Sequence, residues 1–162
     1  CEGGNDMDKK GIIFDMDGTL CSTYDVPNWL EMLRKYDSTP YAIAKPMWDF
    51  ARLNAAVIAL MEIGVEIKIV SWCSKESTKN FDDNVREVKR KWLNENGFPF
   101  NSCRITPYGY PKEYLRNKDA YNILIDDNPS VRENFCRFEN CEAIDPTKVD
   151  IIEWLENLYK GE

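Results

Sequence analysis

Two aspartates separated by one residue, Asp15 and Asp17, follow a short apolar run and are followed at once by Gly18 and Thr19. In an extended segment side chains alternate, so both carboxylates point to one side and Met16 points to the other. Two acids on one side can divide the work of catalysis, because one can attack or bind a metal while the other moves a proton. The spacing alone leaves open the choice between a metal site and an acid–base pair.

Polar side chains also follow two later apolar runs. Ser71 comes after Ile67–Val70, and the pair Asp126–Asp127 comes after Ile123–Ile125. In an open parallel sheet, ligands bind beyond the carboxyl ends of the strands. We therefore expect these groups to meet the first two aspartates at one edge of a sheet, although they are distant in the sequence.

Carboxylates that meet at one edge repel and raise one another's pKa, and a hard divalent cation relieves the repulsion. Mg²⁺ prefers oxygen ligands and keeps several waters. We expect Asp15 and Asp126 as its side-chain ligands, with the carbonyl of Asp17 as a further ligand. Asp127 is expected behind them, either as a supporting group of the metal site or as an acid at a helix N-terminus. The metal would hold a phosphate oxygen against Asp15.

Phosphoryl transfer also needs a cation that offsets developing charge. Lys112 and Lys118 precede Asp126, and Lys112 is favoured because residues 111–115 resemble a helix start facing the site. Ser71, with nearby backbone N–H groups, would grip a second phosphate oxygen. Thr19 either contributes a hydrogen bond on the phosphate side or braces the turn, and the sequence does not decide between these roles.

The composition excludes several classes of protein. The 162 residues contain no histidine, so Ser–His and Cys–His nucleophiles and His-ligated metal sites are impossible. The net charge of −7 argues against a nucleic-acid polymer as partner. It allows a small phosphorylated substrate, because one Mg²⁺ can reverse the local field. No apolar run has membrane-spanning length and no secretory pattern is visible, so we expect no membrane association.

Cysteine usage favours a cytoplasmic setting. The six cysteines form no CxxC pair, and a chain of this size and apolar content needs no disulfide staples. Residues 1–6 are interpreted as an N-terminal extension or a cloning remnant, since Met7 followed by charged residues resembles a natural start. A lipidated N-terminus would also begin with a cysteine such as Cys1.

Apolar runs alternate with amphipathic patterns, which predicts an α/β fold: a Rossmann-like, mostly parallel sheet with helices on both faces. The expected strands are Gly11–Phe14, Val65–Val70, Cys103–Ile105, Ile123–Ile125 and Glu142–Ile144. The expected helices are Met47–Ile63, Glu76–Asn96, Ser130–Phe138 and Val149–Tyr159. One domain is expected over residues 7–162, and residues 21–46 interrupt the alternation as a small helical cap above the first strand.

These motifs resemble the haloacid dehalogenase (HAD) superfamily of phosphotransferases. Residues 15–20, Asp-Met-Asp-Gly-Thr-Leu, look like its first motif, which implies Asp15 as the nucleophile that forms an aspartyl-phosphate. The resemblance implies Asp17 as general acid and then general base. Ser71 resembles the second motif and Asp126–Asp127 the fourth, while the third is a single upstream lysine. The resemblance extends from about Lys9 to Tyr159 and implies a Mg²⁺-dependent phosphatase.

Within the superfamily, the likeness is nearest to the 5′(3′)-deoxyribonucleotidase group, on Asp126–Pro129, the Trp92 helix and Trp154. This implies a nucleoside monophosphate as substrate, although the cap is shorter than in that group. Aromatic residues near the motifs are candidates for stacking on a base or for packing: Tyr24, Trp29, Trp48 and, as the best candidate, Trp72. The alternatives are an open-site phosphatase acting on a phosphoprotein, a sugar phosphate or another large substrate, a phosphomutase or phosphonatase, and a non-catalytic phosphate-binding domain.

Overall fold

A five-stranded parallel sheet organises the chain in the computed structural model, which describes residues 9–161. The strands are β1 (Lys10–Phe14), β2 (Glu66–Trp72), β3 (Ser102–Thr106), β4 (Tyr121–Ile125) and β5 (Cys141–Ile144). Their order in the sheet is β3-β2-β1-β4-β5. The chain builds outward from β1 to β3 and then returns to the other side of β1 with β4. This reversal creates a crevice beyond the carboxyl ends of β1 and β4.

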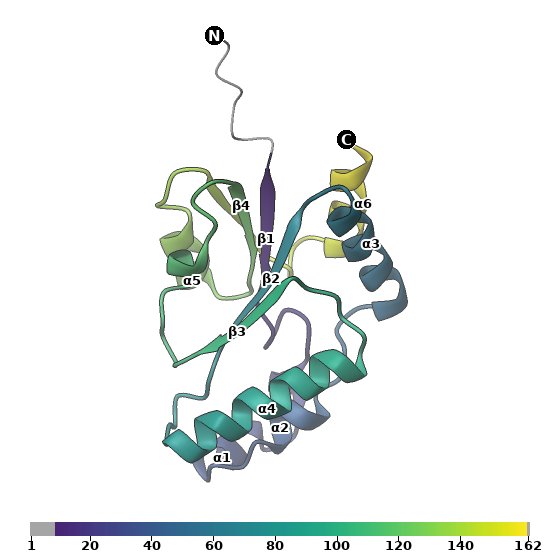
Figure 1. Cartoon of the computed structure of the whole chain (residues 1–162). Helices are drawn as coiled ribbons and strands as arrows, with labels where there is room; N and C mark the ends of the chain where they lie inside the picture. The colour runs from purple at the N-terminus through teal and green to yellow at the C-terminus, as the bar shows by residue number, and fades with distance from the viewer. Residues whose placement is uncertain (1–8, 162) are drawn as a thin grey trace.

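Helices cover both faces of the sheet, as Figure 1 shows. Helices α3 (Phe50–Glu62) and α6 (Ile151–Lys160) pack together on one face. Helix α5 (Pro129–Phe135) and the 3-10 helix η3 (Lys112–Leu115) belong to the other face. Alternate residues of β1 separate the two cores: Ile12 and Phe14 join the α3/α6 core, and Ile13 joins the α5 core.

The remaining helices lie at the carboxyl end of the strands. Residues 21–46, here called the cap segment, form η2 (Thr23–Asp25), α1 (Trp29–Arg34) and α2 (Thr39–Ile43). Helix α4 (Lys79–Glu95) runs beside α1 and α2 below the strand ends in Figure 1. A separate apolar cluster joins them: Leu33, Tyr41, Cys73, Phe81, Val85 and Ile105. Its burial fixes α4 against the cap segment.

The predicted fold class is confirmed, and the differences are at element ends. Strand β2 continues through Trp72, because Ser71 and Trp72 pair with Ile105 and Thr106 of β3. Ser71 therefore lies inside a strand and not after it. Helix α4 begins only at Lys79, where Thr78 caps it by accepting a hydrogen bond from the Phe81 N–H.

The other helices also begin and end differently from the sequence prediction. Asp49 caps α3 and Asp150 caps α6, so α3 starts at Phe50 and α6 at Ile151. Helix α5 ends at Phe135, three residues before the predicted end. The interpretations that concern Cys1 and Met7 fall outside the described residues. Within residues 9–161, none of the helices combines the length and apolarity that crossing a bilayer requires.

Candidate active site

Asp15 and Asp17 emerge from the carboxyl end of β1, at the crevice between β1 and β4. The Asp15 N–H donates to the Ile125 carbonyl at 3.0 Å, which continues the β1–β4 ladder by one residue. Met16 turns into the apolar core, so the two carboxylates face the other way. The alternation expected from the sequence is present.

Lys112 links the first aspartate to the fourth strand. Its ammonium group lies 2.8 Å from Asp15 Oδ1 and 2.8 Å from Asp126 Oδ2, and its side chain is only 2% exposed. Burial disfavours the ammonium form, but the Asp15 and Asp126 carboxylates outweigh burial and raise the pKa of Lys112. A permanent positive charge therefore lies between two carboxylates. Lys118, the other candidate, is exposed in the turn before β4.

Three carboxylates converge beside this lysine. Oxygens of Asp15, Asp126 and Asp127 lie within 4.8 Å of one another. Burial and the neighbouring Asp15 charge raise the pKa of Asp126 to about 6 and that of Asp127 to about 8. A set of oxygen donors under mutual repulsion suits Mg²⁺. The side chain of Asp17 lies outside this cluster, and its third carboxylate comes from Asp127, which the sequence predicts behind the ligands.

Thr19 stabilises the acidic cluster through hydrogen bonds of its buried hydroxyl. Its hydroxyl donates to Asp15 Oδ2 at 3.1 Å and accepts from the Asp127 N–H at 3.2 Å. The side chain is fully buried and is absent from the wall of the crevice. Of the two roles left open by the sequence, the geometry favours bracing over contact with a phosphate.

Asp17 is held by a lysine that the sequence analysis missed. Lys89 of α4 places its ammonium group 2.6 Å from Asp17 Oδ2, and Thr23 donates to Asp17 Oδ1 at 2.6 Å. The Lys89 side chain is 1% exposed. A signal was present in the sequence, because Lys89 lies four residues after Val85 on the face that also carries Phe81 and Trp92. A lysine on the buried face of a helix requires a partner for its charge.

Ser71 lies close to Asp17 but not on the crevice wall. It is fully buried, and its hydroxyl accepts a hydrogen bond from Lys89 at 2.9 Å. Ser74, three residues further along, lines the crevice with Cys73 and Lys75. In this arrangement Ser74, and not Ser71, is available to a ligand.

The crevice is a cavity of about 610 Å³ with an acidic floor and aromatic walls. Trp72 and Tyr108 pack edge to face at 5.1 Å, and Tyr24 and Trp29 do so at 4.9 Å. The Trp72 indole N–H donates to the Tyr110 carbonyl at 2.8 Å, which fixes the ring. Trp48 has a packing role, since it borders the core and donates to the Thr19 carbonyl.

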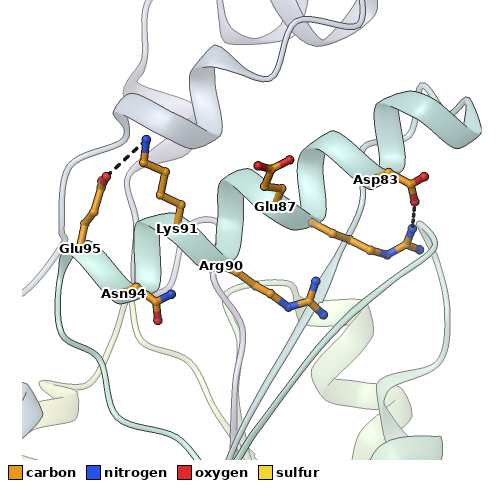
Figure 2. Close-up of a pocket in the computed structure, with 7 residues that line it drawn as sticks. Asp83, Glu87, Arg90, Lys91, Asn94 and Glu95 are labelled. Carbon is orange, nitrogen blue, oxygen red and sulfur yellow. Dashed lines mark hydrogen bonds and ion pairs between the residues drawn. The ribbon is translucent and has the colours of Figure 1, made fainter.

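A second depression, of about 870 Å³, runs along the outward face of α4. Figure 2 shows that its lining is charged and mixed in sign, with ion pairs from Lys91 to Glu95 and from Arg86 to Asp83. It contains none of the strand-end residues. We therefore assign the candidate active site to the first cavity.

The fold and this cavity define the class of protein: a doubly wound parallel α/β domain with a lysine–carboxylate centre where the strand order reverses. No protein-family model matches the sequence, and no curated protein matches it either. Among solved structures, it is similar to D,D-heptose 1,7-bisphosphate phosphatase from B. bronchiseptica, which was determined with magnesium and phosphate. The two share 11% identity with a TM-score of 0.56, over 94% of this chain and 99% of that one. At this identity the likeness establishes the fold.

Proposed function

We propose that this protein is a Mg²⁺-dependent phosphomonoester hydrolase of the HAD type that acts through an aspartyl-phosphate on Asp15. The observation that carries the proposal is the Lys112 ammonium group, 2.8 Å from both Asp15 and Asp126 at the floor of the cavity. Its positive charge would offset the repulsion between a phosphate dianion and the carboxylate nucleophile. The solved structure with a similar fold belongs to a phosphatase that was determined with magnesium and phosphate.

Asp15 would attack the phosphorus atom, and the bond to the ester oxygen would break. Asp17 would protonate that leaving oxygen and then take a proton from the water that attacks the phosphorylated Asp15, releasing inorganic phosphate. Asp15, Asp126 and Asp127 would hold Mg²⁺ through their oxygens. When bound, the metal supplies positive charge against the phosphate oxygens.

We further propose a nucleoside monophosphate as the substrate. Support comes from the aromatic walls of the cavity. Trp72 and Tyr108 form one edge-to-face pair there, and Tyr24 and Trp29 form another. Aromatic faces stack on bases with little dependence on base identity. A sugar phosphate is the second candidate, since the similar phosphatase is named for a sugar bisphosphate. A cytoplasmic setting is also part of the proposal, and the five cysteines among residues 9–161 are free thiols.

The first experiment measures hydrolysis of p-nitrophenyl phosphate with Mg²⁺ and after EDTA treatment. We expect Asp15→Asn to reduce kcat by at least about 10³-fold without changing the circular dichroism spectrum. Asp119→Asn, which changes an exposed carboxyl in the turn before β4, is the matched control and keeps full activity. Wild-type levels of hydrolysis by Asp15→Asn would refute the nucleophile assignment.

The second experiment compares kcat/KM for dUMP, dTMP, sugar phosphates and phosphopeptides. The nucleotide proposal expects the highest kcat/KM for the nucleotides and a loss on Trp72→Ala that is larger for them than for sugar phosphates. Preference for a sugar phosphate or a phosphopeptide would replace the substrate proposal while keeping the reaction. A protein that hydrolyses none of these esters with Mg²⁺ present would instead support the non-catalytic, phosphate-binding alternative.

A further inference from the structure

Among residues 9–161, Lys89 is the buried charged group that the reaction proposed above does not use. Its ammonium group carries three protons, and three acceptors surround it: Asp17 Oδ2 at 2.6 Å, Ser71 Oγ at 2.9 Å and the Trp72 carbonyl at 2.7 Å. Every donor is therefore used, and the group cannot turn without breaking a hydrogen bond. Burial opposes the charge, but the Asp17 carboxylate outweighs it and raises the pKa of Lys89.

The two oxygens of Asp17 are engaged differently. Oδ1 accepts from the Thr23 hydroxyl at 2.6 Å and from the Cys21 thiol at 3.8 Å. A carboxylate oxygen offers about two acceptor positions, so Oδ1 is saturated. Oδ2 accepts from Lys89, which leaves one position on that atom for the cavity that Asp17 lines. The arrangement presents a single atom of Asp17 to a ligand.

Lys89 also connects Asp17 to the cap segment. The Tyr41 ring of α2 lies over the ammonium group, with 4.4 Å from Nζ to the ring centroid. Tyr41 itself lines the cavity. Lys89 thus contacts strand β2, the cap segment and the turn after β1, and it holds Asp17 in a fixed relation to all three.

We propose that Lys89 is a positioning residue for Asp17. It fixes the carboxylate so that Oδ2 faces the cavity, where this atom gives a proton to the leaving oxygen and then takes one from the attacking water. This inference rests on the proposed function, because it assigns Lys89 to the proton-transfer step of that reaction. Hydrogen-bond partners that orient the ligands of a metal site contribute about 10- to 100-fold to activity, and we take the same range for a residue that orients a reacting carboxylate. The alternative is that Lys89 only stabilises the fold.

The test is a double-mutant cycle on the full chain with Mg²⁺ and p-nitrophenyl phosphate. We expect Lys89→Met to lower kcat about 10- to 100-fold with KM changed by less than about twofold. In the Asp17→Asn background we expect the same substitution to lower kcat by less than about twofold, because the group it positions is already gone. Lys91→Met is the matched control, since Lys91 lies on the solvent-facing side of the same helix, 73% exposed (Figure 2).

A purely structural role predicts equal losses in both backgrounds, and that result, or full activity of Lys89→Met, would overturn the inference. Lys89→Gln keeps an N–H donor near Asp17 and replaces Lys89→Met in the cycle if the latter does not fold. Failure of the proposed function is a distinguishable result, because the wild-type protein itself would then show no hydrolysis. Thermal melting of every variant confirms that folded proteins are compared.

Discussion

At the level of single residues, Gly18 joins backbone conformation to the acidic cluster. Its φ of 78° lies in the left-handed region, and a β-carbon there would collide with the Asp127 carboxylate. The turn that follows Asp17 can therefore approach Asp127 closely only with glycine at this position. Two physical reasons therefore favour glycine at position 18: its positive φ, and the Asp127 side chain that approaches it from the loop after β4.

We predict that Gly18→Ala lowers the free energy of unfolding by about 1–2 kcal/mol from the backbone conformation alone. It should also displace the Asp127 carboxylate and weaken Mg²⁺ binding about tenfold or more. Calorimetric titration with Mg²⁺ and thermal melting measure the two effects. Gly64→Ala is the matched control, because its φ is 92° with nothing within 4 Å of the added carbon. Equal Mg²⁺ affinities for the two variants would contradict the role assigned to Gly18.

Residue types at strand ends were predictable because parallel strands end at the same edge of a sheet. The positions of Asp15, Asp126 and Lys112 follow from that rule together with one helix start. Lys89 was not predictable in this way, since its partner Asp17 lies 72 residues away in the sequence and α4 has no fixed direction until it packs on the cap segment. The sequence places the end of β2 two residues too early, because pairing with β3 extends the strand beyond its apolar run and through Ser71.

At the level of elements, helix α5 holds the fourth-strand aspartates in place. Asn128 caps α5 by accepting from the Ser130 and Val131 N–H groups at 3.0 and 3.3 Å. Its own N–H donates to Asp126 Oδ1 at 2.9 Å. The start of α5 and the Asp126 carboxylate are therefore built from the same three-residue segment, Asp126 to Asn128.

We predict that Asn128→Ala removes the cap and costs about 1 kcal/mol of stability, which lowers Tm by about 2–4 °C in a domain of this size. Asn128→Ser retains a side-chain acceptor and should melt within about 1 °C of the wild type. Because the backbone hydrogen bond from residue 128 to Asp126 remains in both variants, kcat should stay close to that of the wild type. A Tm for Asn128→Ala no lower than that for Asn128→Ser would argue against the cap.

The elements themselves were largely predictable from apolar runs and helical periodicity, since β1 is buried on both faces and α3, α4 and α6 are amphipathic. What the pattern did not contain is where α4 lies. The apolar face of α4 is shared between two partners: Phe81 and Val85 pack against Leu33 and Tyr41 of the cap segment, whereas Trp92 and Leu93 join the core under the sheet. This choice depends on contacts between distant segments, which periodicity does not encode.

At the level of the whole molecule, the acidic cluster links stability to pH. Burial and Asp15 raise the pKa of Asp126 to about 6 and that of Asp127 to about 8, whereas an unfolded aspartate titrates near about 3.9. Without metal, the folded protein therefore binds more protons than the unfolded chain between about pH 4 and about pH 8. The stabilising contribution is complete below about pH 4 and is lost as pH rises through about 6 and then about 8.

We predict that the EDTA-treated protein loses Tm between pH 6 and pH 8, and that Mg²⁺ restores more of it at pH 8. The metal must displace protons from Asp126 and Asp127, so less of its binding energy is spent on deprotonation at the higher pH. Thermal melting at both pH values, with EDTA and with Mg²⁺, measures this. Asp127→Asn removes one of the two titrating groups while the rest of the chain titrates as before, so its metal-free Tm should fall less over the same interval. Parallel pH dependences for the wild type and Asp127→Asn would mean that the carboxylate cluster is not the source of the effect.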